Sequence, residues 1–334
     1  MTSFMLLSEW LPVIQREYLR TFVKEGGASV KFAIPVNGMS KEAVNEGLKS
    51  VAEAEGYLFV PIDAATTKVH MIDKLFHTVA KQVPWDELAW VFIRRNLSDR
   101  VRLPQDQKEM TIENLAQLNS SLSLADMNEK INATLKERLW QEYSMTQEFR
   151  IAMVKLCHSL LDPTGTGPST AATIKEWLRG DLRLISTLKS AQIFQKIDRY
   201  NARHMIASLA YWLHLTGQSG LCVTLDISQF LDAQRPKDTD GTLRYTKSAV
   251  LGGYEVLRQF IDDTDELKYF LMVIIAPLTV LEQEGKRSLW RYNALKLRVW
   301  DEVYDRQRVN PLASLVRLGG GASLAVAPAY GGPS

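Results

Sequence analysis

The feature that most constrains the fold is a series of short, almost wholly apolar runs separated by helical patterns. The runs are residues 29–35, 57–63, 221–226 and 268–277. A helical pattern over 41–54 joins the first two runs, and this strand–turn–helix–strand order requires parallel strands. Strands without polar alternation are typical of parallel sheets that are covered on both faces. We therefore predict an α/β protein with a doubly covered parallel sheet, and a fifth strand over 313–318.

A long stretch between the second and third runs has no strand pattern. Residues 67–216 show apolar residues at helical spacing almost throughout, with a Gly- and Pro-rich break at 162–170. Further helices are expected over 8–25, 113–137, 139–161, 171–215, 248–262 and 289–304. We therefore expect the first part of an α/β core over 1–66, a helical insertion over 67–216, the second part of the core over 217–318 and a flexible tail over 319–334.

Composition narrows the classes of function. The 334 residues contain 40 Lys and Arg against 38 Asp and Glu, which leaves a net charge of +2. Nucleic acid could therefore bind only through a local basic patch. Cys157 and Cys222 lie in apolar runs, and we interpret them as buried free thiols in a reducing, cytoplasmic protein. The five histidines lack metal-ligand spacing, and the longest apolar run, 269–280, is too short to cross a membrane. The first nine residues lack the pattern of a signal peptide.

Ligands of open parallel sheets bind outside the carboxyl ends of the strands. That rule places the turn after Ile34, Asp63 and Asp226 side by side. We also expect the strand before this turn to adjoin the strand that ends in Asp226.

The turn after the first strand stands where a phosphate-binding loop would lie. Such a loop needs glycines, a lysine for the outer phosphates and a Ser or Thr for Mg²⁺. Gly38 and Lys41 stand where that pattern requires them. Pro35 and Ser40 replace two glycines, and Glu42 replaces the Ser or Thr. Proline removes a donor and Glu42 adds a negative charge, so tight magnesium-dependent ATP binding is not expected.

The run ending in Asp226 has the form of a Walker B strand, in which the acid organises the metal ion. An active ATPase of this broad class has a glutamate next, to polarise water, whereas this chain has Ile227. Asp226 could equally be a strand-end residue that caps a turn. Arg291, Arg298 and Arg306 could reach a phosphate, although charges on a helix surface explain them more simply. No Ser/His/Asp or Cys/His arrangement predicts a catalytic nucleophile.

Two basic clusters make nucleic acid an alternative ligand. The first contains Arg94 and Arg95, and the second contains Arg287 and Arg291 beside Trp290. Cations next to aromatic rings can bind phosphates and stack on bases. Solvated helix faces with core aromatics would give the same pattern.

The order of these elements resembles the BREX-system ATP-binding domain family, P-loop proteins of bacterial anti-phage defence islands. The residues that carry the resemblance are 16–19, 26–32, 63–65, 69–73, 197–202 and 220–226, within residues 8–318. The resemblance implies an ASCE- or AAA+-like P-loop core with a helical insertion. It implies ATP and Mg²⁺ as cofactors, with Gly38, Ser40 and Lys41 at the phosphate loop and Asp226 on the metal side.

The altered loop and the missing glutamate lead to three hypotheses. The first is a degenerate P-loop protein that serves a BREX-like defence system as a scaffold or regulatory subunit. Its partners would be a larger ATPase, a methyltransferase or a nuclease, with double-stranded DNA as a further candidate. The second is an active ATPase or nucleotide-gated switch of the same system. The third is a sequence-independent DNA-binding module.

Overall fold

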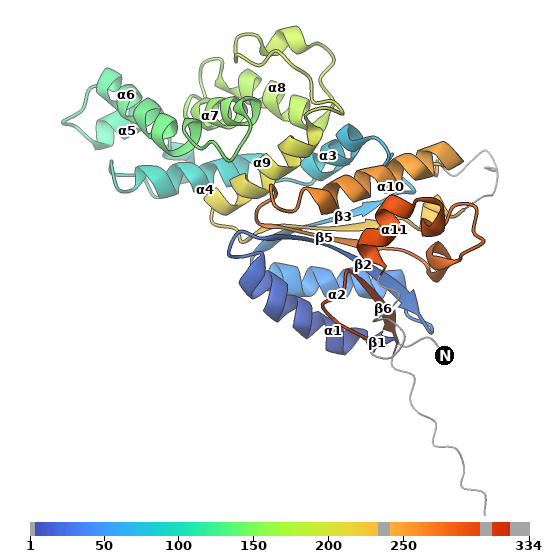
Figure 1. Ribbon diagram of the computed structural model, residues 1–334. Helices are drawn as coiled ribbons and strands as arrows, with labels where there is room; N and C mark the ends of the chain where they lie inside the picture. Colours follow the sequence, from blue (N-terminus) through green and yellow to red (C-terminus); the bar gives the residue numbers. More distant parts are fainter. Residues whose placement is uncertain (1–3, 233–240, 301–308, 321–334) are drawn as a thin grey trace, which may run out of the picture.

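The structure, a computed structural model, describes residues 4–232, 241–300 and 309–320 (Figure 1). These residues contain one six-stranded sheet in the order β1-β6-β2-β5-β4-β3, and every pair of neighbouring strands is parallel. The strands are β1 (Met5–Leu6), β2 (Ala28–Val36), β3 (Tyr57–Asp63), β4 (Gly220–Asp226), β5 (Phe270–Ile275) and β6 (Leu315–Gly319). The predicted α/β class is confirmed.

Helices cover both faces of this sheet. The α-helices are α1 (Leu7–Val13), α2 (Lys41–Ala54), α3 (Ile72–Lys81), α4 (Trp85–Leu97), α5 (Ile112–Leu118), α6 (Leu124–Leu135), α7 (Gln147–Leu161), α8 (Gly167–Arg179), α9 (Ala202–Leu215), α10 (Lys247–Asp262) and α11 (Asn293–Val299). The π-helices are η1 (Ile14–Phe22) and η3 (Lys136–Trp140). The 3₁₀ helices are η2 (Gln107–Glu109), η4 (Ile185–Leu188), η5 (Ser228–Phe230), η6 (Leu278–Leu281) and η7 (Leu289–Arg291).

Two hydrophobic cores lie on the two faces. On one face Trp10 and Leu48, from α1 and α2, pack in the same cluster as Val273 of β5. On the other face, Phe32 of β2 belongs to a larger cluster that continues through α3 to α10 (Figure 1). The burial of both faces explains why the strands lack polar alternation. The helical region over 67–216 therefore shares its core with one face of the sheet.

The prediction that the first long strand, β2, adjoins the strand that ends in Asp226, β4, was wrong. β5 lies between β2 and β4, so the strand before the turn does not adjoin the strand that ends in Asp226. Phe270 of β5 is in register with Ala28 on one side and with Leu221 on the other. All six residues of β5 are buried, and such a strand gains most at the centre of the sheet.

Several expected helices are shorter than the sequence pattern indicated. Residues 119–123 and 141–146 interrupt the helices predicted over 113–137 and 139–161, and most of 180–201 is not helical. α8 begins inside the predicted break because a proline is tolerated in the first turn of a helix. β6 extends to Gly319, one residue into the expected tail, and residues 321–334 and Arg306 lie outside the described residues.

Both cysteines are buried free thiols, as the sequence predicted. Burial raises the pKa of Cys157 and raises that of Cys222 to about 12, which makes both thiols unreactive at neutral pH. Within the described parts of the chain, no helix is both long and apolar enough to cross a membrane.

Candidate nucleotide site at the carboxyl edge of the sheet

The turn between β2 and α2 is much tighter than a phosphate-binding loop. β2 continues through Pro35 and Val36, which are in register with Leu318 and Gly319 of β6. The chain then reverses at Asn37 and Gly38, whose φ angles are 50° and 77°. The Met39 N–H closes the turn by donating to the Val36 carbonyl at 3.1 Å. Positive φ at both central positions is typical of an Asn-Gly turn of type I′.

This geometry gives Gly38 a role in forming the turn. A phosphate loop surrounds its ligand with backbone N–H groups that have no other partner. The eight-residue motif would occupy residues 35–42. Its first two residues, Pro35 and Val36, belong to β2, and the Met39 N–H is already bonded. Gly38 is required by its positive φ, and an added Cβ would meet no atom within 4 Å.

The N-terminus of α2 is capped by its own residues. The Ser40 hydroxyl accepts a hydrogen bond from the Ala43 N–H at 3.0 Å, so it occupies a donor that a bound anion would otherwise use. Glu42 is exposed in the first turn, where its charge complements the helix dipole. Two of the three residues that depart from the phosphate motif, Ser40 and Glu42, therefore stabilise the start of this helix.

Lys41 and Asp226 lie together at the carboxyl edge of the sheet. The Lys41 Nζ atom is 2.5 Å from Asp226 Oδ2. The hydrogen bond that Lys41 donates to Asp226 is the main reason that the pKa of Lys41 is raised, with added attraction from Asp63 and Glu42. Asp226 is 13% exposed and Lys41 42%, so one side of the pair faces solvent. The structure thus brings together two of the predicted site residues that lie far apart in the sequence.

The second oxygen of Asp226 is also occupied. Asp226 Oδ1 accepts hydrogen bonds from the Ser228 N–H at 2.8 Å and from the Ser228 hydroxyl at 2.6 Å. The predicted turn-capping role of Asp226 and its pairing with Lys41 therefore coexist. Ser228 was not among the predicted site residues, although an Asp that bonds to the residue two positions later is a recognised turn pattern.

The groups around this pair offer little to a nucleotide. Ile227 is fully buried, and β5, between β2 and β4, ends at the buried Ile275, which the buried Ala276 follows. Asp63 is in register with Asp226 across the β3–β4 pair, so it adds a second carboxylate at this edge. Among the described residues, no group of three or more His, Cys, Asp or Glu side chains could hold a metal ion. The arrangement at Asp226 does not fit a bound Mg²⁺ ion, because both oxygens of this carboxylate already have partners.

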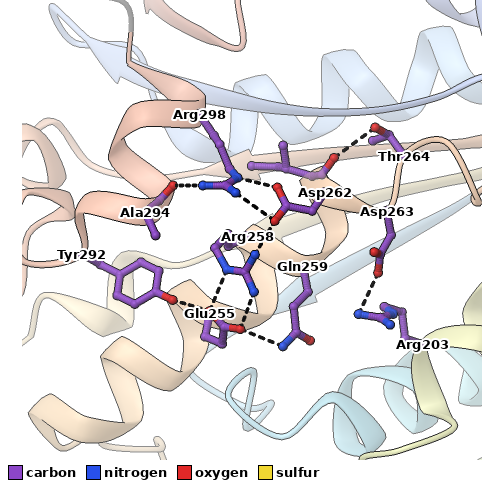
Figure 2. Close-up of polar contacts among 11 residues, drawn as sticks. Arg203, Glu255, Arg258, Gln259, Asp262, Asp263, Thr264, Tyr292, Ala294 and Arg298 are labelled. Carbon is purple, nitrogen blue, oxygen red and sulfur yellow. Dashed lines mark hydrogen bonds and ion pairs between the residues drawn. The ribbon is translucent and has the colours of Figure 1, made fainter.

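The arginines beyond β5 have other partners. Arg298 contacts Asp262 with its Nε atom and, at 3.0 Å, with its Nη2 atom (Figure 2). Arg287 donates to the backbone carbonyls of Phe230 at 3.2 Å and Asp232 at 2.9 Å, and Arg291 donates to that of Gly285 at 3.3 Å. The simpler interpretation, in which these cations serve the local structure, is the one that their contacts favour.

Figure 2 shows that Arg298 belongs to a polar network that joins α10 to α11. Asp262 accepts from both Arg298 and Arg258, and Glu255 accepts from Arg258 and Tyr292. The hydrogen bond from Arg258 is the main cause that lowers the pKa of Glu255 to about 2, with Tyr292 and Gln259 adding to it. A carboxylate that remains charged in this way holds the two helices together at neutral pH.

The first basic cluster lies at the end of α4, away from the carboxyl edge (Figure 1). Arg94 donates to the carbonyls of Pro104 at 3.3 Å and Gln105 at 3.1 Å, while Arg95 is exposed. The predicted nucleic-acid residues Arg94, Arg95, Arg287 and Arg291 therefore do not form one surface together with the Lys41–Asp226 pair.

Fold and site together define a class of protein. A wholly parallel sheet, a strand that leads through a turn into a helix beginning with lysine, and an acid at the end of β4 are consistent with a P-loop NTPase-like core. The family model for BREX system ATP-binding protein BrxC/D matches residues 105–321, about two thirds of the chain. The chain belongs to this family.

The match covers most of the helical region and the second part of the sheet. It includes the strand ending in Asp226, β5 and β6, and it begins after the turn at Asn37 and Gly38. The family relationship is thus carried by the part of the chain that lacks the phosphate-loop position. No curated protein and no solved structure matches the chain.

Proposed function

We propose that this BREX-family chain works as a scaffold or regulatory subunit whose nucleotide site has degenerated. Its partners would be other proteins of the same defence system, such as a larger ATPase, a methyltransferase or a nuclease. The proposal concerns the role within the system, since membership of the family follows from the match over residues 105–321.

The turn at Asn37 and Gly38 is the observation that carries this proposal. A phosphate loop must leave its N–H groups free and wrap around an anion, whereas this turn is closed by its own hydrogen bond. Reopening it would require Pro35 and Val36 to leave their pairing with β6. The absence of a glutamate after Asp226 removes the group that would activate water.

A nucleotide-gated switch is the second candidate, and the Lys41–Asp226 pair favours it. The lysine and the acid of the motif are still in contact, and Lys41 is partly exposed. A triphosphate that binds at this edge would have to take Lys41 from Asp226, which would couple binding to the end of β4. The description of the family as ATP-binding also supports this candidate.

Thermal unfolding with and without millimolar Mg-ATP separates the two candidates. A ligand present at about 100 times its Kd would add about 2.7 kcal/mol to the free energy of unfolding and raise the Tm by several degrees. We expect no change in Tm and no phosphate release above that of the buffer. The measurements are differential scanning calorimetry and a steady-state phosphate assay on the full chain.

Lys41→Ala and Asp226→Ala are the matched variants for this test. Lys41 lies at the surface, so its truncation should leave the fold intact. We expect both variants to respond to Mg-ATP as the unsubstituted protein does. A rise in Tm that both variants lose would reject the degenerate site and establish the nucleotide-gated switch.

A scaffold must bind its partners without nucleotide. We therefore expect co-expressed proteins of the same defence system to elute with this chain in gel filtration, equally with and without ATP. Lys41→Ala should leave that complex unchanged. Complexes that form only in the presence of ATP, and not with Lys41→Ala, would contradict the scaffold role.

A further inference from the structure

The segment between α8 and α9 is a long connection on the helical region (Figure 1). Residues 180–201 contain one short element, η4, and otherwise run as turns and extended chain. A connection of this length without regular structure is uncommon in a compact domain, and such connections are often functional. Its position in the helical region separates it from the carboxyl edge of the sheet.

Buried anchors hold this segment in place. Leu188, Ile193 and Ile197 are almost fully buried. The indole N–H of Trp177 donates to the Gln195 carbonyl at 3.0 Å, and the Asn201 amide donates to the Lys196 carbonyl at 3.1 Å. The exposed side chains between these anchors are therefore presented by a fixed backbone.

Large apolar side chains and cations alternate on the outside of the segment. Leu184, Phe194 and Tyr200 are 65%, 67% and 70% exposed. The cations that accompany them are all exposed: Arg183, Lys189, Lys196 and Arg199. We call these seven residues the aromatic-basic surface.

Contacts within the segment bring some of these residues together. Lys196 Nζ donates to the Arg183 carbonyl at 3.2 Å, which brings the two ends of the segment together. The Arg199 guanidinium lies 4.6 Å from the centre of the Tyr200 ring. A cation thus stands beside an exposed ring.

The two acids of the segment are occupied. Asp181 pairs with Lys81 of α3 at 3.0 Å. Asp198 Oδ1 accepts the Tyr200 N–H at 2.8 Å. The four exposed cations outnumber these two acids, so the segment presents a net positive charge, which complements a polyanion.

We propose that the aromatic-basic surface binds single-stranded nucleic acid without sequence preference. Exposed rings stack on bases, and flanking cations bind the phosphates. A duplex hides the faces of its bases inside the stack, so Phe194 and Tyr200 favour the single strand. This site is separate from the Lys41–Asp226 pair, and it needs neither nucleotide binding nor the scaffold role.

Fluorescence anisotropy with labelled oligothymidine of about 20 nucleotides tests the proposal on the full chain. We expect binding at low salt that is stronger than binding to a duplex of the same length. Phe194→Ala and Tyr200→Ala should each weaken binding about fivefold or more, which corresponds to the loss of one stacked base. Arg183→Ala and Lys196→Ala should each reduce the slope of log K against log salt by about 0.7.

Tyr143→Ala is the matched control, because Tyr143 is 79% exposed and lies outside the segment. It should leave the affinity unchanged, and all variants should keep the original Tm because the replaced side chains lie at the surface. Absence of binding at low salt would overturn the proposal, as would equal affinities of Tyr200→Ala and Tyr143→Ala. Displacement of the oligonucleotide by polyglutamate, with no effect of either ring, would also overturn it and indicate an acidic protein partner.

Discussion

Replacing Gly220 with alanine should lower the free energy of unfolding by about 3 kcal/mol. Gly220 begins β4 with a φ of +145°, a conformation that side chains with a Cβ rarely adopt. An added Cβ would lie 2.2 Å from the Tyr269 carbonyl oxygen, which belongs to the backbone. Leu221 donates its N–H to the same carbonyl at 2.9 Å, so neither strand can move without losing a bond at the start of the β4–β5 pair.

Gly38→Ala is the control for that experiment. Gly38 also has a positive φ, +77°, but no atom lies within 4 Å of its added Cβ. Its replacement should cost only the backbone strain, about 1 kcal/mol. Urea unfolding followed by circular dichroism measures both variants. Equal losses would show that the contact with Tyr269 contributes nothing beyond the strained φ.

The second large effect concerns Lys31, a buried lysine of β2. Its side chain is 2% exposed in β2, and its Nζ atom donates to the carbonyls of Leu312 at 2.8 Å and Ala313 at 3.0 Å. It lies 4.3 Å from the centre of the Tyr18 ring. Burial lowers the pKa of Lys31 from 10.5 to about 8. Lys31 therefore ties the chain that leads into β6 to β2 at the cost of desolvating a charge.

Because the pKa of Lys31 is lowered on folding, Lys31 makes the free energy of unfolding rise with pH. Between pH 8 and 10.5 the unfolded chain keeps the proton on Lys31 and the folded chain releases it. Stability rises with pH wherever the unfolded state binds more protons. We expect Lys31 to contribute a gain of about 1 kcal/mol to the free energy of unfolding from pH 8 to pH 9. Lys31→Met should lack this gain.

The pH range of this test must end near pH 9, because other buried groups lower the stability of the folded state as pH rises further. Burial raises the pKa of Cys222 to about 12 and also raises that of Tyr57. Above the ordinary pKa of each group the unfolded chain loses the proton first, so the free energy of unfolding falls as pH rises. The difference between the unsubstituted protein and Lys31→Met, measured by urea unfolding at pH 7, 8 and 9, isolates Lys31. A difference that does not change across these three pH values would rule out this account.

The elements of the core could be predicted from local pattern alone. Ser40 before α2, Gly56 after it and the apolar run 57–63 determine a helix and a strand whose bounds the structure reproduces. The helical region was less predictable, because short polar interruptions such as 119–123 do not break the spacing of apolar residues. Asp226 at the end of β4 and Lys41 at the start of α2 also followed from the sequence.

The contact between Lys41 and Asp226 was decided by the tertiary structure. The two residues are 185 positions apart, and β5 separates their strands in the sheet. The Asn-Gly turn at the position of the expected phosphate loop depends on β6, which pairs with Pro35 and Val36 and so extends β2. Local sequence determines which residues form strands and helices, because spacing and capping act over a few residues. Hydrogen bonds and burial between distant strands determine their order, and with it what this edge of the sheet can bind.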